Sequence, residues 1–357
     1  MPALLVSILP VTRRRRRDQP LRTRSSLTAK FGLLLLSTFV GFSLVVLTSK
    51  EHSPSPSSNW NFLSKEDFFY SNKKTISNMS TKIIVVVPTY YADLNDIRYQ
   101  LALDCCTEIQ RHGLEMIVVD ASPQNERIQQ EMTQKGLNVE EPTRKSRVQV
   151  VRQTELGRKG AALRQGIALV LKQAQDRNET HETIIAFQEP EKSDMIRFWK
   201  PVVQHMLHEH ADVIVPTRSN ESFLSTYPIE QYHSETFANL HLNTLGQQSN
   251  TPIPKHPFPS NLDWTMGPVA IRADTMAAHY LSYMGDSWDL QLVPLVRAHR
   301  WHKAKIVASM PIDYQHPAEM KRQEEGVPTW NEKRLLQLNF LFQHVGNAWK
   351  EVKEGGD

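Results

Sequence analysis

Residues 82–91 read KIIVVVPTYY, a continuous run of branched apolar residues that ends in a proline. A run without polar alternation is typical of a strand that is buried on both faces, as in a parallel sheet. LEMIVVDAS at 114–122 repeats the pattern and ends near Asp120, and VQVVRQ at 148–153 and ETIIAFQEPEK at 182–192 follow. These four segments predict an α/β protein built on a mostly parallel sheet.

Helical segments are predicted between these strands, at about 95–112, within the polar stretch 124–146, and at 157–175. A further helix at about 194–210 leads to a fifth strand, ADVIVPTRS at 211–219. Alternating strands and helices are typical of a doubly wound sheet with right-handed crossovers and helices on both faces.

The second half of the chain is less regular. We expect a helix within 220–262, a strand and turn at 264–274, an acidic opening that becomes helical at 285–302, a strand at 303–317 and an amphipathic helix near 331–350. No internal repeat is evident, so the whole of 81–350 is predicted to form one large domain.

The N-terminal region has a different composition. Five consecutive arginines, Arg13 to Arg17, precede FGLLLLSTFVGFSLVVLTS at 31–49, which has no charged residue. As a helix this run spans roughly 28 Å, close to the ~30 Å hydrocarbon core of a bilayer. The positive flank places 1–30 in the cytoplasm as a basic tail. Residues 50–80, rich in Ser, Asn, Pro and Lys, are predicted to be a flexible stem.

These features predict a single-pass type II protein in the Golgi or endoplasmic reticulum membrane, with a signal anchor at 31–49 and a luminal domain. Sequons at Asn78, Asn178 and Asn220 agree with a luminal glycoprotein. The competing interpretations are a buried core helix, a cleaved signal peptide, a nuclear localisation signal in the arginine run, and a plastid address, because the sequence does not reveal the organism.

Charge and cysteine content argue against a nucleic-acid-binding protein and against a fold held by disulfides. The net charge of +4 comes mostly from the arginine-rich arm, so the rest of the chain is close to neutral and no nucleic-acid partner is implied. The two cysteines, Cys105 and Cys106, are adjacent and cannot form a disulfide framework. Buried thiols in a helix are the expected state.

Polar residues follow the predicted strands at one edge of the sheet, where open parallel sheets bind ligands. The first strand ends in Pro88-Thr89-Tyr90, the second in Asp120, and the fourth in Glu189-Pro-Glu191, while Gly157-Arg158-Lys159-Gly160 opens a helix at the same edge. Taken singly, the aspartate is a cap, the lysine is solvated and the glutamates belong to a turn. Together they predict a nucleotide-diphosphate pocket.

The succession IIVVVPTY, IVVDAS, GRKGAALRQG and an acidic pair after a strand resembles the family-2-like glycosyltransferases of the GT-A fold, over about residues 82–317. The resemblance implies that the nucleotide sugar is held by Pro88, Thr89, Tyr90, Asp120, Lys159 and Arg164. In that family the acidic pair is usually Asp-x-Asp and coordinates a divalent cation, Mn²⁺ or Mg²⁺. Here Glu-Pro-Glu replaces it, so Glu191 is predicted to ligate the metal and Glu189 to contact the sugar.

The resemblance also divides the domain into a nucleotide-sugar half, 81–219, and an acceptor half, 220–350. In the second half it implies that Gly267 and Pro268 shape the acceptor side. Asp286 and Asp289 are the catalytic candidates, as general base or substrate ligand, unless Asp286 is a helix cap. His316 is a candidate third metal ligand, with a structural or solvated histidine as the alternative.

The predicted function is transfer of a sugar from a nucleoside-diphosphate sugar to a hydroxyl group of a glycan, lipid or small acceptor, with inversion or retention left open. A membrane-anchored pseudoenzyme that binds a nucleotide sugar or glycan without turnover is the alternative. A nucleotidyltransferase is disfavoured, because those enzymes place a glycine-rich Arg-Lys loop directly after the first strand, where this chain has Pro-Thr-Tyr.

Overall fold

The structure is a computed structural model that describes residues 81–137, 146–155, 158–248 and 256–351. The predicted tail, anchor and stem (1–30, 31–49 and 50–80) lie outside the described residues. Within the described residues, no helix combines the length and the apolar character that a membrane span requires.

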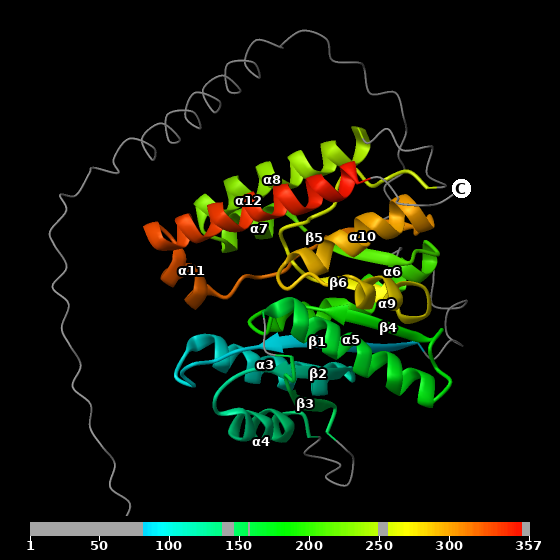
Figure 1. Ribbon diagram of the computed structural model, residues 1–357. Helices are drawn as coiled ribbons and strands as arrows, with labels where there is room; N and C mark the ends of the chain where they lie inside the picture. The colour runs from blue at the N-terminus through cyan, green and yellow to red at the C-terminus, as the bar shows by residue number, and fades with distance from the viewer. Residues whose placement is uncertain (1–80, 138–145, 156–157, 249–255, 352–357) are drawn as a thin grey trace, which may run out of the picture. The chain divides into compact units, whose positions relative to one another are not determined.

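The domain is built on a seven-stranded mixed sheet in the order β3-β2-β1-β4-β6-β5-β7 (Figure 1). The strands are β1 (Lys82–Thr89), β2 (Glu115–Asp120), β3 (Val148–Arg152), β4 (Thr183–Phe187), β5 (Val213–Arg218), β6 (Val269–Arg272) and β7 (Ile306–Ile312). All neighbouring pairs are parallel except those of β6, which runs antiparallel to both β4 and β5. The predicted mostly parallel α/β sheet is confirmed.

Eleven helical segments are described around this sheet. They are α3 (Ile97–His112), α4 (Asn125–Lys135), α5 (Lys159–Asp176), the 3₁₀ helix η2 (Ser193–Phe198), α6 (Trp199–His208), α7 (Asn220–Thr226), α8 (Ile229–Gln248), α9 (Ala273–Ser282), α10 (Asp289–His302), α11 (Ala318–Glu324) and α12 (Pro328–Lys350). Local sequence explains several boundaries: the Asp96 side chain caps α3, Gly113 ends it at φ +67°, and Pro328 opens α12.

Each strand of the central sheet contributes side chains to two cores. Ile84 and Val86 of β1 pack with α5, α9 and α10, whereas Val85 and Val87 pack with α3, η2 and α6. Both faces of the sheet are therefore covered, which is why β1 is apolar without alternation. Beyond α10, helices α8 and α12 lie against each other and form an outer layer (Figure 1).

The strand order reverses at the centre of the sheet, because β2 lies on one side of β1 and β4 on the other. Ligands of doubly wound sheets bind at the carboxyl ends of the strands at such a switch point. The first strand was predicted to end in Pro88-Thr89-Tyr90, and β1 ends within this stretch, at Thr89. β4 pairs with β1 only as far as Val86, so the missing amide N–H of Pro88 interrupts no bond of that ladder.

The predicted halves, 81–219 and 220–350, share this sheet, because β6 and β7 of the second half pair with β4 and β5 of the first. Helices α9 and α11 were not predicted. Cys105 and Cys106 are buried in α3 as expected, and burial raises the pKa of the Cys106 thiol to about 12.

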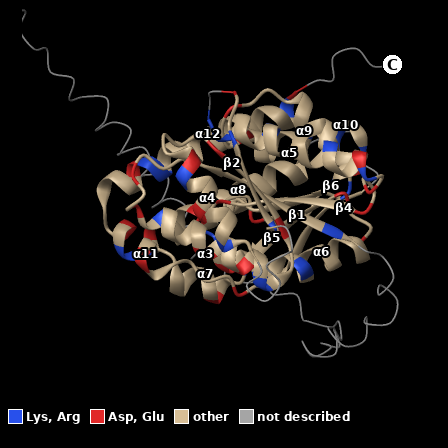
Figure 2. Ribbon diagram, turned by 90° about the horizontal axis from the view of Figure 1, so that it is seen from below, with Lys and Arg blue, Asp and Glu red and all other residues tan. Residues whose placement is uncertain are grey.

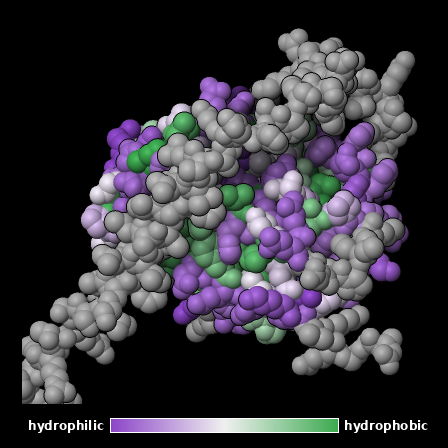
Figure 3. All heavy atoms as spheres, turned by 90° about the horizontal axis from the view of Figure 1, so that it is seen from above, coloured by the Kyte–Doolittle hydropathy of each residue, from purple (hydrophilic) through white to green (hydrophobic). Residues whose placement is uncertain are grey.

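The surface carries both signs of charge. Figure 2 shows Lys and Arg interspersed with Asp and Glu over the outer helices, while the strands are free of them for most of their length. Seen from above (Figure 3), hydrophobic side chains gather among hydrophilic ones on the side where α8 and α12 lie in Figure 1. Leu240 of α8 and Leu336 of α12 are exposed apolar residues of these two helices.

Candidate functional site

A groove of about 370 Å³ opens at the carboxyl ends of the central strands, and we call it the edge groove. It is lined by Pro88, Thr89, Tyr90, Ala121, Gln153, Arg158, Lys159, Ala162, Glu189, Pro190, Glu191 and Trp288. The structure thus brings together six predicted site residues, from the ends of β1 and β4 and from the start of α5. Arg158, from the predicted glycine-rich turn, also lines the groove, and Trp288 is a lining residue that was not predicted.

Lys159 is the first residue of α5 and its side chain lies inside the groove. Its Nζ is 2.5 Å from Glu189 Oε1 and 3.5 Å from the centre of the Trp288 ring. Burial lowers the pKa of Lys159, and Glu189 opposes this shift. Gly160 is needed beside it, because a Cβ there would lie 2.6 Å from the carbonyl carbon of Asp286. The start of α5 therefore holds a partly desolvated cation at the strand ends.

Glu189 is buried between two lysines. Besides the contact with Lys159, its Oε2 lies 3.3 Å from Lys192 Nζ. Burial opposes its ionisation, but Lys159 and Lys192 outweigh this cost and lower the pKa of Glu189 to about 2. Gly267, at φ +96°, lies directly against this carboxylate, and a Cβ there would be 2.7 Å from Oε1. Gln291 fixes the same turn by donating to the Gly267 carbonyl (3.0 Å).

Glu191 is the accessible member of the acidic pair, since it lines the edge groove and is only partly buried. Within the described residues, no group of three or more His, Cys, Asp and Glu side chains is arranged to hold a metal ion. A divalent cation that is also ligated by a diphosphate needs only one or two carboxylates from the protein. Glu191 fits that requirement, whereas both oxygens of Glu189 already face lysines.

Asp120 is fully buried at the end of β2 and is not among the groove-lining residues. Its carboxylate accepts hydrogen bonds from the Thr89 hydroxyl (2.8 Å), the Ser122 amide and hydroxyl (3.2 and 2.6 Å) and the Asn125 amide group (2.8 Å). Ser122 in turn accepts from the Tyr91 amide. In this structure Asp120 holds the loops after β1 and β2 together, and its predicted contact with a nucleotide stays a prediction.

Arg164 is also buried and away from the groove lining. Its guanidinium donates to the carbonyls of Tyr283 and Gly285 and lies 3.2 Å from Glu155 and 3.3 Å from Asp286. Arg164 thus links α5 to the loop before α10, and its predicted contact with a nucleotide stays a prediction.

The two aspartates predicted to be catalytic do not share a helix face, because α10 begins at Asp289 and Asp286 precedes it. Asp289 is buried, and it accepts hydrogen bonds from the Tyr283 hydroxyl and the Ser287 amide, both 2.9 Å long. Neither aspartate lines the edge groove; the residue between them that does so is Trp288. This geometry lends no support to a catalytic role for either.

A second cavity of about 160 Å³, which we call the inner cavity, lies between the loop after β4 and helices α8, α10, α11 and α12. Glu189, Glu191 and Trp288 line both spaces, so the two meet at these side chains. His316, a predicted metal ligand, lines the inner cavity and stacks on Tyr227 with ring centres 4.3 Å apart. Burial, followed by Lys192, lowers its pKa to about 3.

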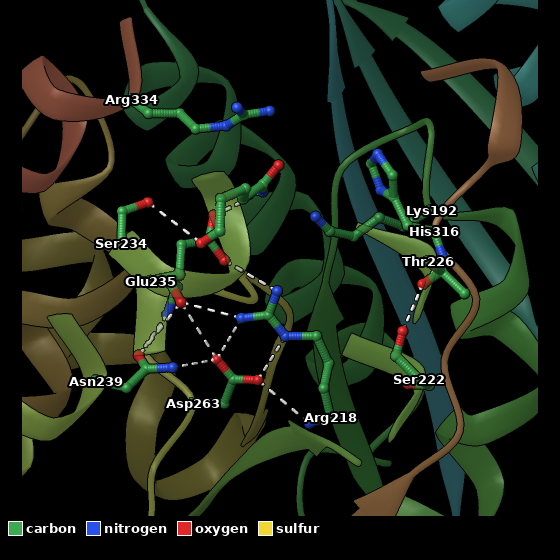
Figure 4. Close-up of polar contacts among 12 residues, drawn as sticks. Lys192, Arg218, Ser222, Thr226, Ser234, Glu235, Asn239, Asp263, His316 and Arg334 are labelled. Atoms are coloured by element: carbon green, nitrogen blue, oxygen red, sulfur yellow. Dashed lines mark hydrogen bonds and ion pairs between the residues drawn. The ribbon is translucent and has the colours of Figure 1, made fainter. Parts of the chain in front are cut away.

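The wall of the inner cavity rests on a buried ionic cluster that sequence reasoning missed. Arg218 at the end of β5 binds Asp263 in a bidentate arrangement (both 2.7 Å) and lies 2.9 Å from Glu235 (Figure 4). The three residues are 17 to 45 positions apart, with no local motif to connect them. The sequence offered one signal for Arg218: β5 ends in the polar residues of VPTRS, as β1 and β2 also end in polar residues.

No protein-family model matches the chain, and a search of curated proteins finds no match. Among solved structures, the chain is similar to glucosyl-3-phosphoglycerate synthase from Mycobacterium tuberculosis in complex with phosphoglyceric acid, at 14% identity and a TM-score of 0.41, covering 75% of this chain and 81% of that one. The same enzyme in complex with Mg²⁺ and uridine diphosphate is similar at 12% identity and a TM-score of 0.39, covering 75% of this chain and 80% of that one.

Mannosyl-3-phosphoglycerate synthase from Rubrobacter xylanophilus is similar at 12% identity and a TM-score of 0.38, covering 72% of this chain and 75% of that one. All these neighbours carry the names of synthases that transfer glycosyl groups. At TM-scores of 0.38 to 0.41 the similarity decides neither fold nor function.

Proposed function

We propose that the protein is a glycosyltransferase that moves a sugar from a nucleoside-diphosphate sugar to a hydroxyl group, with the donor bound in the edge groove. One observation carries this proposal: the groove joins two cations, two aromatic rings and a free carboxylate at the switch point of the sheet. Tyr90 is 65% exposed and offers a ring face to a base or sugar, and Trp288 lines the same groove with Lys159 over its ring.

Transfer requires stabilisation of the diphosphate as it leaves. Lys159 and Arg158 lie at the start of α5, where the helix dipole also favours an anion. Preorganised cations in a partly desolvated groove stabilise developing charge more strongly than water does. Lys159 exchanges part of its contact with Glu189 for the diphosphate, and Lys192 keeps Glu189 paired. The acceptor hydroxyl enters from the inner cavity, which meets the groove at Trp288.

A donor screen tests this function. The full chain is incubated with a panel of nucleoside-diphosphate sugars and Mn²⁺, and released nucleoside diphosphate is measured. We expect one donor class to be consumed, and Lys159→Gln to lower its turnover at least ~100-fold. Lys172→Gln, an exposed position further along α5, is the matched control. If the chain binds a nucleotide sugar without turnover, the pseudoenzyme alternative holds; if no nucleotide sugar binds at all, both proposals fail.

We further propose Glu191 as the protein ligand of a divalent cation, which would supply Lewis-acid stabilisation of the diphosphate. Its support is the free carboxylate in the groove beside the clamped Glu189. Glu191→Gln is expected to raise the Mn²⁺ concentration needed for half-maximal turnover by roughly tenfold, since one anionic oxygen ligand is removed. An unchanged Mn²⁺ requirement would exclude Glu191 as a ligand.

The compartment is a separate proposal, based on residues outside the described part of the chain. The arginine arm and the apolar run 31–49 support a type II protein of the Golgi or endoplasmic reticulum membrane. Protease added to sealed microsomes should then remove only the arm at 1–30. Digestion of the large domain would show that this topology is wrong.

A further inference from the structure

The inner cavity is lined by buried polar groups that have no partner among the described residues. The Tyr227 hydroxyl and Gln291 Oε1 lack hydrogen bonds, although the two residues are only 2% and 1% exposed. His316 Nε2 is a third such atom in the same lining. Leaving buried polar atoms unpaired costs about 1–3 kcal/mol each, so three in one small space indicate a site built for a polar ligand.

Several hydrogen-bond donors line this space, beside acceptors such as Gln291 Oε1. The Lys192 ammonium, the Arg334 guanidinium and the ring of His316 line it from three separate elements (Figure 4). Burial raises the pKa of Tyr227, so its hydroxyl keeps its proton and can donate. Arg334 retains free N–H groups, because Glu324 and Asn331 occupy only two of its five.

The charged groups that act most strongly on His316 are cations. Apart from burial, the groups that lower its pKa are all cations, namely Lys192, Arg218, Arg334 and Lys321. Three of the four carboxylates that line the cavity are engaged: Glu189 with Lys159 and Lys192, Glu235 with Arg218, and Glu324 with Arg334. The fourth, Glu191, lies where the cavity meets the edge groove. The ammonium of Lys192, the guanidinium of Arg334 and a hydroxyl that can donate, gathered around His316, match an anion rather than a neutral polyol.

We propose that the inner cavity binds the phosphate or carboxylate group of a small hydroxylated compound, with Lys192, Tyr227 and His316 as its principal donors. Its volume corresponds to roughly five water molecules, which suits one anionic group and a short carbon chain. Because the cavity meets the edge groove at Glu191 and Trp288, this compound is the sugar acceptor. That identification as acceptor rests on the proposed function, whereas the anion site itself does not.

The test is a binding titration of the full chain with glycerol 3-phosphate and with lactate at constant ionic strength and without nucleotide. Glycerol is the matched uncharged ligand. We expect saturable binding of at least one anion and none of glycerol. Lys192→Gln should weaken that binding at least tenfold, and Lys200→Gln on α6, away from both spaces, should not change it. Equal affinity in wild type and Lys192→Gln, or saturable binding of glycerol alone, would overturn the site.

Two further measurements decide where the anion binds and which kind of molecule carries it. If Lys159→Gln rather than Lys192→Gln abolishes binding, the anion occupies the edge groove and the proposal fails. Vesicles that carry a phosphomonoester lipid test the other source of the same chemistry: binding to them but not to glycerol 3-phosphate supports the site and assigns its anion to a lipid headgroup.

The outcome is separable from that of the donor screen. Anion binding that depends on Lys192, in a chain that consumes no nucleotide sugar, would remove the proposed function and keep the site. Donor consumption without anion binding would remove only the site.

Discussion

The edge groove and the inner cavity meet at the same three side chains but are built in different ways. The groove is formed by strand ends and the first turn of α5, with Lys159 as its cation. The inner cavity is formed mainly by helices from the second half of the chain, with Lys192 as its cation. Both lysines bind one carboxylate, Glu189. The two proposed binding sites therefore share one buried charge, and this account predicts that each binds its own ligand through its own lysine.

Glu189→Gln has the largest expected effect, because it leaves two buried lysines without their shared carboxylate. Removing one partner of a buried ion pair typically costs about 3–5 kcal/mol of unfolding free energy. Glu191→Gln is the control two residues away, since Glu191 forms no salt bridge within the described residues. Its free energy of unfolding should stay within about ±0.5 kcal/mol of the wild-type value. Urea unfolding measures both. Similar values for the two variants would mean that Glu189 does not organise the sites.

Gly267→Ala tests the same carboxylate from its other side. The new Cβ would lie 2.7 and 2.8 Å from the Glu189 oxygens, at a backbone φ of +96°. We expect the free energy of unfolding of Gly267→Ala to fall by about 2–3 kcal/mol. Gly326→Ala also has a positive φ, +71°, but its Cβ would meet no atom within 4 Å, so about 1 kcal/mol is expected from backbone strain alone. Thermal unfolding of the two variants isolates the clash with Glu189, and identical losses would contradict it.

His316, which lines the inner cavity but not the edge groove, should make the stability of the protein depend on pH. Its folded-state pKa of about 3 lies below the usual 6.5, so its contribution to stability is complete above pH 6.5 and is lost as the pH falls toward 3. Between these two pH values the free energy of unfolding is expected to fall by about 1.4 kcal/mol for each pH unit. His316→Phe retains an aromatic ring against Tyr227 and should flatten that slope between pH 6.5 and 4.5. An unchanged slope would place the acid sensitivity elsewhere.

The sequence predicted the groove better than the cavity for a physical reason. Strand ends of a parallel sheet meet at one edge whatever the loops do, so Thr89, Lys159 and Glu189 could be brought together from local patterns. Lys192, Arg218 and Tyr227 meet only because helices of the second half pack onto the sheet, which no periodicity encodes. The hydrogen bonds of Asp120 could not be predicted for a related reason: its position at a strand end was visible in the sequence, but its four donors were not.

The organisation of two sites around Glu189 is tested most directly by crossed binding measurements on the full chain. The nucleoside diphosphate of the preferred donor and glycerol 3-phosphate, or lactate, are titrated separately into wild type, Lys159→Gln and Lys192→Gln. We predict that Lys159→Gln weakens the diphosphate about tenfold, or about 1.4 kcal/mol, and leaves the small anion unchanged, while Lys192→Gln does the reverse. If both variants weaken both ligands equally, the two spaces form one site and this account is contradicted.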